Sequence, residues 1–212
     1  MPWRYIVVEG VIGVGKTSLT KLLSTRMNGR LNLEVVEENP FLTSFYTDRS
    51  AYAFQTQIFF LLSRFRQQQN LFQHDLFSST MISDYLFAKD RIFANLNLSD
   101  DELALYNQLA NILEQRVLKS DLVIYLQART EVLQQRIQWR GRAYEQDMDD
   151  GYLNALNGAY SYFFHHYKDA PLLVVNTDNL DFVNVPADFD LLYDHIQESF
   201  TGTRYFAPNT AP

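Results

Sequence analysis

The feature of the sequence that most constrains its fold is a glycine-rich stretch, residues 10–17, which reads GVIGVGKT. An apolar run at residues 5–9 precedes it and predicts a buried strand, and residues 18–27 follow with leucines spaced as on one helix face. This is the context in which G-x-x-x-x-G-K-[ST] forms a P-loop, whose backbone N–H groups bind phosphate at a helix N-terminus. The predicted phosphate site comprises the motif and the residue after it: Gly10, Val11, Ile12, Gly13, Val14, Gly15, Lys16, Thr17 and Ser18.

Two side chains of this motif and one acidic residue farther along form a candidate metal site. In P-loop proteins the lysine contacts the β- and γ-phosphates, while the hydroxyl residue after it and an acid at a strand end hold Mg²⁺. Lys16 and Thr17 occupy the first two positions, and Asp84 ends a predicted strand at residues 78–84. We therefore expect ATP or another nucleoside triphosphate as ligand, with Thr17 and Asp84 binding Mg²⁺.

Strand and helix signals alternate along the chain, a pattern typical of a parallel sheet covered by helices. The expected strands are residues 5–9, 33–36, 78–84, 121–127 and 171–176. The expected helices are residues 18–27, 50–72, 100–119, 130–139, 151–168 and 186–200, and Ser99 with Glu102 is a capping-box signal for the third of them. This pattern predicts an α/β fold of the P-loop NTPase type, with three layers and a five-stranded parallel sheet. No linker interrupts it, so we expect a single domain over 1–212, an arginine-rich lid at about 140–150 and a loose tail at 201–212.

The composition excludes several classes of function. A net charge of -7 argues against binding to a DNA or RNA polymer. The absence of cysteine removes disulfides and cysteine-based metal or thiol chemistry, and the four histidines show no metal-ligand spacing. The N-terminus leads directly into the first strand and no apolar run reaches membrane-spanning length. The expectation is therefore a cytoplasmic protein with no membrane partner.

A basic segment near the end of the 130–139 helix is a second candidate phosphate site. Arg136 and Arg140 share one helix face, and Arg142 follows shortly after. Guanidinium groups match phosphate oxygens and spread the charge that develops as a phosphoryl group moves. By itself the segment fits equally well a solvated helix end, where cations complement the helix dipole. Its presence in one chain with a P-loop favours a role in phosphoryl transfer.

Acidic residues around the second predicted strand are candidates for a general base. Glu37 and Glu38 follow the strand at 33–36, on the edge where parallel sheets bind ligands. Either carboxylate could accept a proton from an attacking hydroxyl. Glu34 lies inside the predicted strand and is less well placed for this role.

Two polar residues on the 50–72 helix suggest a site for a nucleobase. Gln57 and Arg64 lie on one helix face, and the neighbours of Gln57 are apolar. A buried glutamine amide can donate and accept hydrogen bonds at once, which suits the edge of a base. An exposed polar stripe is the alternative, and it fits the glutamines at 67–69 better than Gln57.

Five stretches taken together resemble the deoxynucleoside kinase family. They are residues 10–17, 34–46, 54–64, 83–94 and 136–145, and the resemblance extends from Val7 to about Val183. It implies an ATP:deoxynucleoside 5′-phosphotransferase that moves the γ-phosphoryl group of ATP to the 5′-hydroxyl of a deoxynucleoside in nucleotide salvage, with Mg²⁺. It also implies a homodimer formed through helices such as 50–72 and 100–119.

The resemblance assigns roles to residues that would contact the sugar. Aligning the strand valines places the family's catalytic base at Glu38, with Glu37 as an alternative one residue earlier. Tyr46 matches a tyrosine that contacts the 3′-hydroxyl of the sugar. Glu145 matches a lid glutamate that makes the same contact.

The contacts to base and phosphate carry over in the same way. Gln57 matches the glutamine that reads the base, and Arg64 and Asp90 match the Arg–Asp pair beside it. One departure concerns the segment after the third strand, where many members have an arginine that braces the 5′-oxygen and this chain has Tyr85 after Asp84. The matches to the catalytic lid arginines and to the loop near the donor base are Arg136, Arg140, Arg142 and Asp178.

The nucleobase and two other functions stay open at this point. Asp90, if ionised, favours an amino group as on adenine or cytosine, whereas Arg64 would suit the O6 of guanine. A purine deoxynucleoside is therefore expected, with deoxycytidine second and thymidine last. A nucleoside monophosphate kinase would need further cations for the acceptor's phosphate, for which Arg49, Arg66 and Arg91 are the candidates. A regulatory P-loop module is disfavoured by the lid arginines and the polar helix residues.

Overall fold

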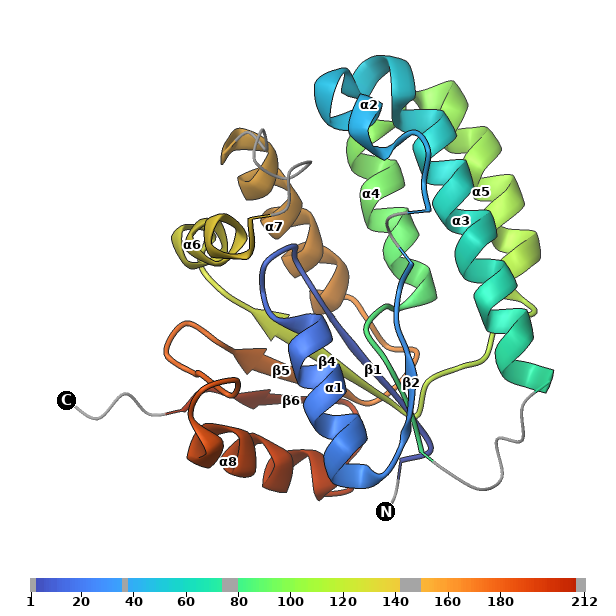
Figure 1. The fold of residues 1–212 in the computed structure, drawn as a ribbon. Helices are drawn as coiled ribbons and strands as arrows, with labels where there is room; N and C mark the ends of the chain where they lie inside the picture. Colours follow the sequence, from blue (N-terminus) through green and yellow to red (C-terminus); the bar gives the residue numbers. More distant parts are fainter. Residues whose placement is uncertain (1–2, 36–37, 74–79, 142–149, 209–212) are drawn as a thin grey trace.

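The computed structural model describes residues 3–35, 38–73, 80–141 and 150–208 of the chain. Its strands form one sheet at the centre of the molecule, in the order β2-β3-β1-β4-β5-β6 (Figure 1). Every neighbouring pair of strands is parallel. The strands are β1 (Tyr5–Gly10), β2 (Arg30–Asn32), β3 (Met81–Ser83), β4 (Leu122–Gln127), β5 (Leu172–Asn176) and β6 (Thr203–Phe206).

The central strands are buried on both faces because their sequences are almost entirely apolar. Every residue of β1 is buried, and so is every residue of β4 except the last. Uninterrupted burial of this kind is typical of a parallel sheet with helices on both sides. Strands β3 and β2 lie on one side of β1, and strands β4, β5 and β6 lie on the other. Open parallel sheets bind ligands beyond the carboxyl ends of their strands at such a reversal point.

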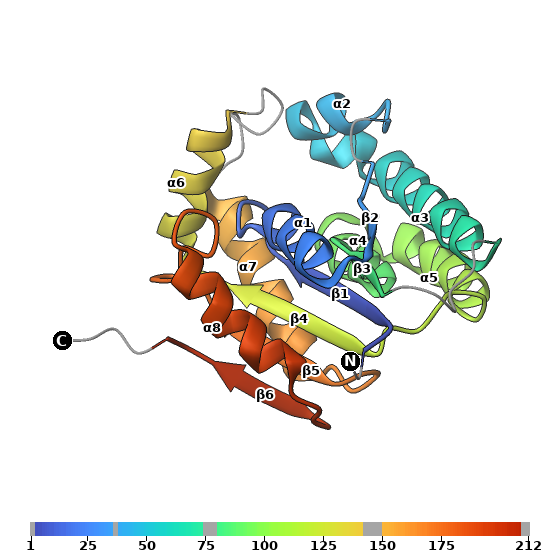
Figure 2. The same ribbon diagram turned by 60° about the horizontal axis from the view of Figure 1, so that its bottom comes forward.

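Helices cover both faces of this sheet, as Figures 1 and 2 show from two directions. The described helices are α1 (Lys16–Met27), α2 (Leu42–Thr47), α3 (Arg49–Gln73), the 3-10 turn η1 (Phe87–Lys89), α4 (Asp90–Asn97), α5 (Asp100–Glu114), α6 (Thr130–Arg140), α7 (Asp150–His165) and α8 (Pro186–Gln197). On one face, Arg26 of α1 lies over the ring of Phe189 in α8. On the other, Phe164 of α7 stacks on Tyr125 of β4, α4 packs on α7, and α3 and α5 pack on α4.

Several boundaries differ from those expected from the sequence. The second strand lies at Arg30–Asn32, because these residues are the ones that pair with β3, and the described residues 33–35 of the strand expected at 33–36 lie outside it. Residues Thr203–Phe206, expected in a loose tail, form β6 against β5, so six strands are described instead of five. α5 ends at Glu114 rather than near residue 119. The capping box of Ser99 and Glu102 at its start is confirmed.

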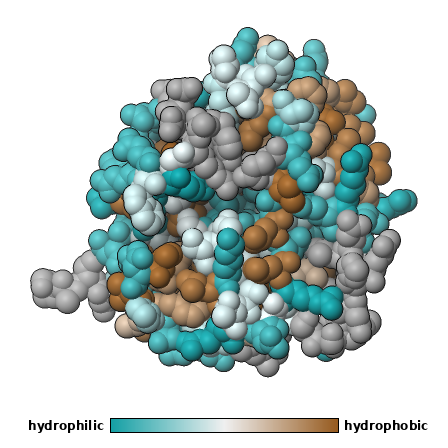
Figure 3. Space-filling model, in the orientation of Figure 1, coloured by the Kyte–Doolittle hydropathy of each residue, from teal (hydrophilic) through white to brown (hydrophobic). Residues whose placement is uncertain are grey.

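Apolar side chains are exposed along the outer faces of α3 and α5. Figure 3 shows apolar surface over these helices at the upper right. On α5, Leu105, Leu109 and Ile112 lie along one helix face, and Ile112 is 61% exposed. On α3, Tyr52 and Leu62 are also exposed. None of the described helices has the length and hydrophobicity needed to cross a membrane.

Candidate active site

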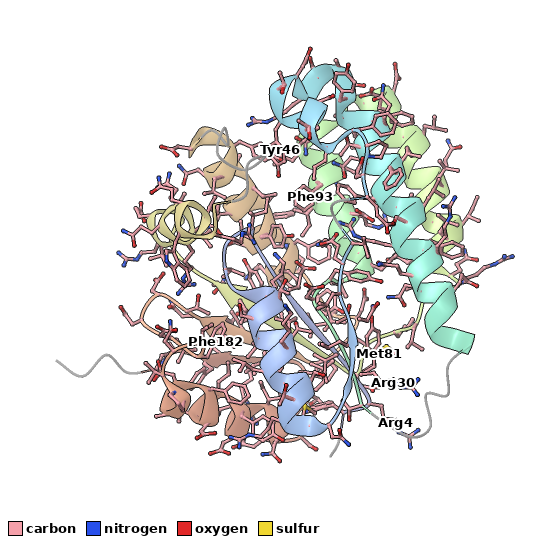
Figure 4. All side chains as sticks on the ribbon, viewed as in Figure 1. Arg4, Arg30, Tyr46, Met81, Phe93 and Phe182 are labelled. Carbon is pink, nitrogen blue, oxygen red and sulfur yellow. The ribbon has the colours of Figure 1, made fainter. Side chains whose placement is uncertain are left out.

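A cavity of about 1150 Å³ opens at the carboxyl edge of the sheet. One end is lined by the P-loop, by α6 and by the loop at residues 178–184. The other end is lined by side chains of α2, α3 and α4 and by Glu34. In Figure 4 the labelled Tyr46 and Phe93 lie on the side of α2 and α4, and Phe182 lies beside α1. One continuous space therefore joins the predicted phosphate site to the predicted base site.

The P-loop wraps closely around its own lysine and packs against α6. The ammonium of Lys16 donates to the carbonyl oxygens of Gly10 at 2.6 Å and Val11 at 3.2 Å. Gly13 has φ 87°, and a Cβ there would lie 2.8 Å from the Ile137 side chain of α6 and 2.9 Å from a backbone oxygen of that helix. Only glycine accepts this backbone conformation without strain and leaves room for the close contact.

Asp84 connects the P-loop to the segment that follows β2. It lies directly after β3 and is buried. One of its carboxylate oxygens accepts a 2.6 Å hydrogen bond from the Thr17 hydroxyl, and the other accepts a 2.7 Å bond from the backbone N–H of Glu34. The two predicted metal ligands, Thr17 and Asp84, thus lie in contact next to Lys16.

Glu9, the residue before the P-loop, has a fully buried carboxylate that accepts three hydrogen bonds. It accepts from the backbone N–H of Gly10 at 2.9 Å, from the backbone N–H of Leu86 at 2.8 Å and from the Tyr160 hydroxyl at 3.3 Å. Burial and the nearby negative charge of Glu9 raise the pKa of Tyr160 well above its ordinary value. Glu9 thereby ties the P-loop to the segment after β3 and to α7.

The charge of Lys16 depends on the acidic groups around it. Burial lowers the pKa of Lys16 to about 8. The negative charge of Glu9 opposes this shift most strongly, followed by Glu34 and Asp84, whereas the positive charge of Lys89 acts with burial. These five ionisable groups therefore lie close enough to form one electrostatic unit at the sheet edge.

Glu34 is at the centre of a buried ion-pair cluster on the other side of Asp84. One carboxylate oxygen accepts from the Arg64 guanidinium, with the Nε bond at 2.8 Å, and the other accepts from the Lys89 ammonium at 2.6 Å. Arg64 also pairs with Asp90, the first residue of α4. Although burial raises the pKa of Glu34, the charges of Arg64 and Lys89 prevail and hold it at about 2. Glu34 is therefore ionised at neutral pH and faces the cavity.

The inner wall formed by α3 contains buried polar atoms that lack a hydrogen-bond partner. Gln57 and Thr56 line the cavity and are 2% and 1% exposed. Within the described ranges, Gln57 Oε1 and Thr56 Oγ1 have no partner. A buried polar atom without a partner costs free energy, so a ligand that pairs with these atoms would be favoured. Gln57 Oε1 offers an acceptor to such a ligand, and the Thr56 hydroxyl can donate or accept. Tyr46 of α2 lies at the same end of the cavity.

The lid side of the cavity is formed by α6 and the loop after β5. Arg136 is half-buried and donates to the carbonyl oxygens of Val14 at 3.2 Å and Thr177 at 2.7 Å. Burial lowers its pKa, against the opposing effect of nearby Asp178 and Asp181. Arg140 is exposed at the cavity edge, and Asp178 also lines the cavity. Two further predicted lid residues, Arg142 and Glu145, lie outside the described residues.

Three predicted site residues are not at the cavity surface. Glu38 is exposed and does not line the cavity, and its alternative Glu37 lies outside the described residues. Tyr85 is fully buried and does not line the cavity, and its hydroxyl accepts from Asn32 at 3.2 Å and lies 3.5 Å from the Gln68 amide nitrogen. Asp90 is buried beneath Arg64 and would act on a ligand through that arginine.

Sequence reasoning missed Glu34, Lys89 and Glu9. Glu34 was set aside because it was assigned to the interior of a strand at 33–36, whereas β2 ends at Asn32 and leaves Glu34 on the ligand-binding edge. The misleading signal was the valine pair, which has high strand propensity. The position of Asp84 at the end of β3 could have indicated that Glu34, which follows the neighbouring strand, lies at the same edge, since parallel strands end on a common edge of the sheet.

Comparisons with known proteins identify the family of this chain. The family model for deoxynucleoside kinase matches residues 6–201. The chain belongs to the deoxynucleoside kinase family. It is 33% identical to the deoxyguanosine kinase of Bacillus subtilis (strain 168) over 199 residues, which cover 92% of this chain and 96% of that protein. It is 29% identical to the deoxyadenosine/deoxycytidine kinase of the same organism, with 90% of each chain covered.

Solved structures of the deoxynucleoside kinase family have the same fold as this chain. The structure of deoxyadenosine kinase from M. mycoides with bound dCTP has a TM-score of 0.77 and 27% identity, and the match covers 91% of this chain and 98% of that one. The same enzyme with bound dATP gives a TM-score of 0.77 at 25% identity. The enzyme is thus a deoxynucleoside kinase with the α/β fold of that family.

Proposed function

We propose that this kinase transfers the γ-phosphoryl group of ATP to the 5′-hydroxyl of a purine deoxynucleoside, deoxyguanosine or deoxyadenosine, in nucleotide salvage. The observation that carries the proposal is the single cavity that runs from the P-loop to the polar wall of α3. A triphosphate and a neutral nucleoside can meet in it end to end. The proposed compartment is the cytoplasm, because the donor triphosphate is available there.

In this proposal Glu34, rather than Glu38, is the general base. Glu34 is ionised, lies in the cavity and is bonded to Asp84 beside the P-loop, whereas Glu38 is exposed outside it. The 5′-hydroxyl would give its proton to the Glu34 carboxylate as the oxygen attacks the γ-phosphorus. Lys16 and the lid arginines Arg136, Arg140 and Arg142 would stabilise charge on the transferred group. Positioning and electrostatics therefore supply most of the rate.

Thr17 and Asp84 fit a Mg²⁺ ion that travels with the nucleotide. Mg²⁺ in phosphoryl-transfer sites is usually held by one or two protein oxygens together with phosphate oxygens and water. A hydroxyl and a carboxylate in contact beside the P-loop lysine provide that donor set. The described residues contain no cluster of three or more His, Cys, Asp or Glu that would suit a separate protein-bound ion. When bound, Mg²⁺ would neutralise charge on the phosphates.

The proposed purine preference rests on the hydrogen-bonding groups that α3 presents to the cavity. Gln57 Oε1 lacks a partner, and its amide can pair with the N6/N7 edge of adenine. Asp90 holds Arg64 in a fixed position, where the guanidinium could serve the O6 of guanine. The names of the relatives in Bacillus subtilis support a purine and also keep deoxycytidine as the second candidate. Thymine, with an acceptor O4 and a methyl group, suits this wall least.

A selectivity assay tests this proposal. Purified enzyme with ATP and Mg²⁺ would be given deoxyguanosine, deoxyadenosine, deoxycytidine or thymidine at equal concentration, with dGMP and dAMP as parallel acceptors. We expect 5′-monophosphate from one or both purine deoxynucleosides at the highest kcat/KM. A thymidine preference would contradict the base assignment. Turnover of the monophosphates alone would identify a nucleoside monophosphate kinase instead.

The proposed homodimer would form through the exposed apolar faces of α3 and α5. Leu105, Leu109 and Ile112 are spaced along one side of α5, and Leu62 is exposed on α3, which packs against α5. A two-fold interface uses the same patch on both copies, so two such helix pairs could pack face to face. The double variant Leu109→Glu, Ile112→Glu should sediment as a monomer where the parent sediments as a dimer. A monomeric parent would refute the dimer.

A further inference from the structure

Lys89 is a buried cation that the phosphate-binding motifs do not account for. It lies at the end of η1, its side chain is 4% exposed, and it lines the cavity. Lysine is almost never buried to this degree unless it is paired or has a function that requires it. Its ammonium donates to Glu34 at 2.6 Å.

The ammonium of Lys89 has hydrogen-bonding capacity beyond this ion pair. A protonated lysine has three N–H donors. Among the residues that the structure describes, Glu34 is its only hydrogen-bond partner, which leaves two donors for a ligand. Arg64, the other cation on Glu34, is instead shared between Glu34 and Asp90. Of the two cations on Glu34, Lys89 is therefore the one bound to a single carboxylate, with two N–H donors left for a ligand.

The position of Lys89 is between the two ends of the cavity. Its charge acts on Lys16 of the P-loop, and its ammonium contacts the proposed base Glu34. An acceptor oxygen bonded to Glu34 would therefore lie next to the Lys89 ammonium. Tyr85 cannot take this place, because it is fully buried, does not line the cavity and has its hydroxyl bonded to Asn32.

We propose that Lys89 is a catalytic residue whose ammonium hydrogen-bonds the 5′-oxygen of the acceptor deoxynucleoside. The inference rests on the proposed function. As the 5′-oxygen forms its bond to the γ-phosphorus, the bond from that phosphorus to the bridging oxygen breaks and its electron pair leaves with ADP. The 5′-hydroxyl proton passes to Glu34. Lys89 stays protonated, orients the oxygen and offsets the negative charge that gathers around the transferred group.

The experiment compares Lys89→Met and Lys89→Arg with Lys119→Met, a change of an exposed lysine outside the active-site cavity. Loss of one preorganised donor at a developing charge typically lowers kcat by about 10²–10³-fold. We expect Lys89→Met to lose at least about 100-fold in kcat while its Kd for ATP changes by less than about threefold. Lys89→Arg should recover part of the loss, and Lys119→Met should match the parent.

A second readout separates a direct contact from a structural role. A 5′-deoxy analogue of the substrate lacks the oxygen that Lys89 would bind. We expect the parent to bind the natural deoxynucleoside about tenfold more tightly than this analogue, and Lys89→Met to keep only the smaller part of this difference that the contact with Glu34 supplies. Equal binding of both ligands by the parent would overturn the proposal, and this measurement needs no variant to fold.

Each remaining outcome is also decisive. A parent that phosphorylates no deoxynucleoside would refute the proposed function itself. An active parent with Lys89→Met within threefold of its kcat would refute only the role of Lys89. A Lys89→Met variant that melts at the parent's temperature, loses turnover and discriminates between the two ligands as strongly as the parent would also refute it.

Discussion

Replacing Glu34 by Gln should abolish most of the turnover and also remove a measurable part of the stability. The change keeps the size of the side chain and removes the charge that Arg64 and Lys89 contact. A general base typically contributes about 10²–10⁴-fold to a rate, which corresponds to roughly 3–5 kcal/mol of transition-state free energy. We therefore expect kcat to fall at least about 100-fold, with little change in the affinity for ATP.

The stability effect follows from the pKa of Glu34, which falls from 4.5 to about 2 on folding. Each pKa unit corresponds to about 1.4 kcal/mol, so the ionised form contributes about 3 kcal/mol to the free energy of unfolding at neutral pH. Because the folded pKa is lowered, this contribution is present above pH 4.5 and is lost as the pH falls toward 2. Urea titrations of Glu34→Gln and parent should therefore differ at pH 7 and converge as the pH drops below 4.5.

The matched control is Glu38→Gln, since Glu38 is exposed outside the cavity. We expect this variant to keep kcat within about threefold and stability within about 0.5 kcal/mol of the parent. The reasoning would be refuted if Glu38→Gln lost turnover and Glu34→Gln did not. A Glu37→Gln variant with the large loss would move the base to that residue.

Three further substitutions, one of them with a control variant, probe other parts of the site. Gly13→Ala should raise the KM for ATP and destabilise the fold by about 1–3 kcal/mol, because Gly13 has a positive φ and lies in close contact with α6. The control is Gly158→Ala, at a helical position where an added Cβ has no atom within 4 Å. Thermal melts of this control should show an unchanged or raised stability. Gln57→Leu should lower kcat/KM for the purine deoxynucleoside about 10–100-fold in steady-state assays without changing the KM for ATP. Glu9→Gln should move the loss of ATP affinity at alkaline pH to lower pH in binding titrations, because Glu9 holds up the pKa of Lys16.

The parts of the site that were predictable are those set by local sequence. The P-loop, its strand and its helix follow from one contiguous motif, and they form at Tyr5–Gly10 and Lys16–Met27. Asp84 was placed correctly at the end of β3 because the strand before it is short and apolar. The arginine at the start of the basic segment, Arg136, reaches the P-loop through the carbonyl of Val14.

The parts that were not predictable depend on pairing between distant segments. Residues 33–36 have better strand propensity than Arg30–Asn32, but hydrogen bonding to β3 selects the latter. That shift is what moves Glu34 from a strand interior to the cavity. Lys89 lies at the end of the short 3-10 turn η1, where no periodicity in the sequence indicates the direction of its side chain. β6 was missed although its residues, Thr203–Phe206, include a β-branched residue and two aromatic ones, because a short edge strand carries little signal.

The most direct test of the account is a crystal structure of the enzyme with ADP and deoxyguanosine. It would show whether both ligands occupy the one cavity and which carboxylate meets the acceptor. We predict the ADP phosphates on the P-loop, the base against Gln57, and the 5′-oxygen within about 2.6–3.2 Å of Glu34. A 5′-oxygen beside Glu38, or a deoxynucleoside bound outside this cavity, would contradict the central claim.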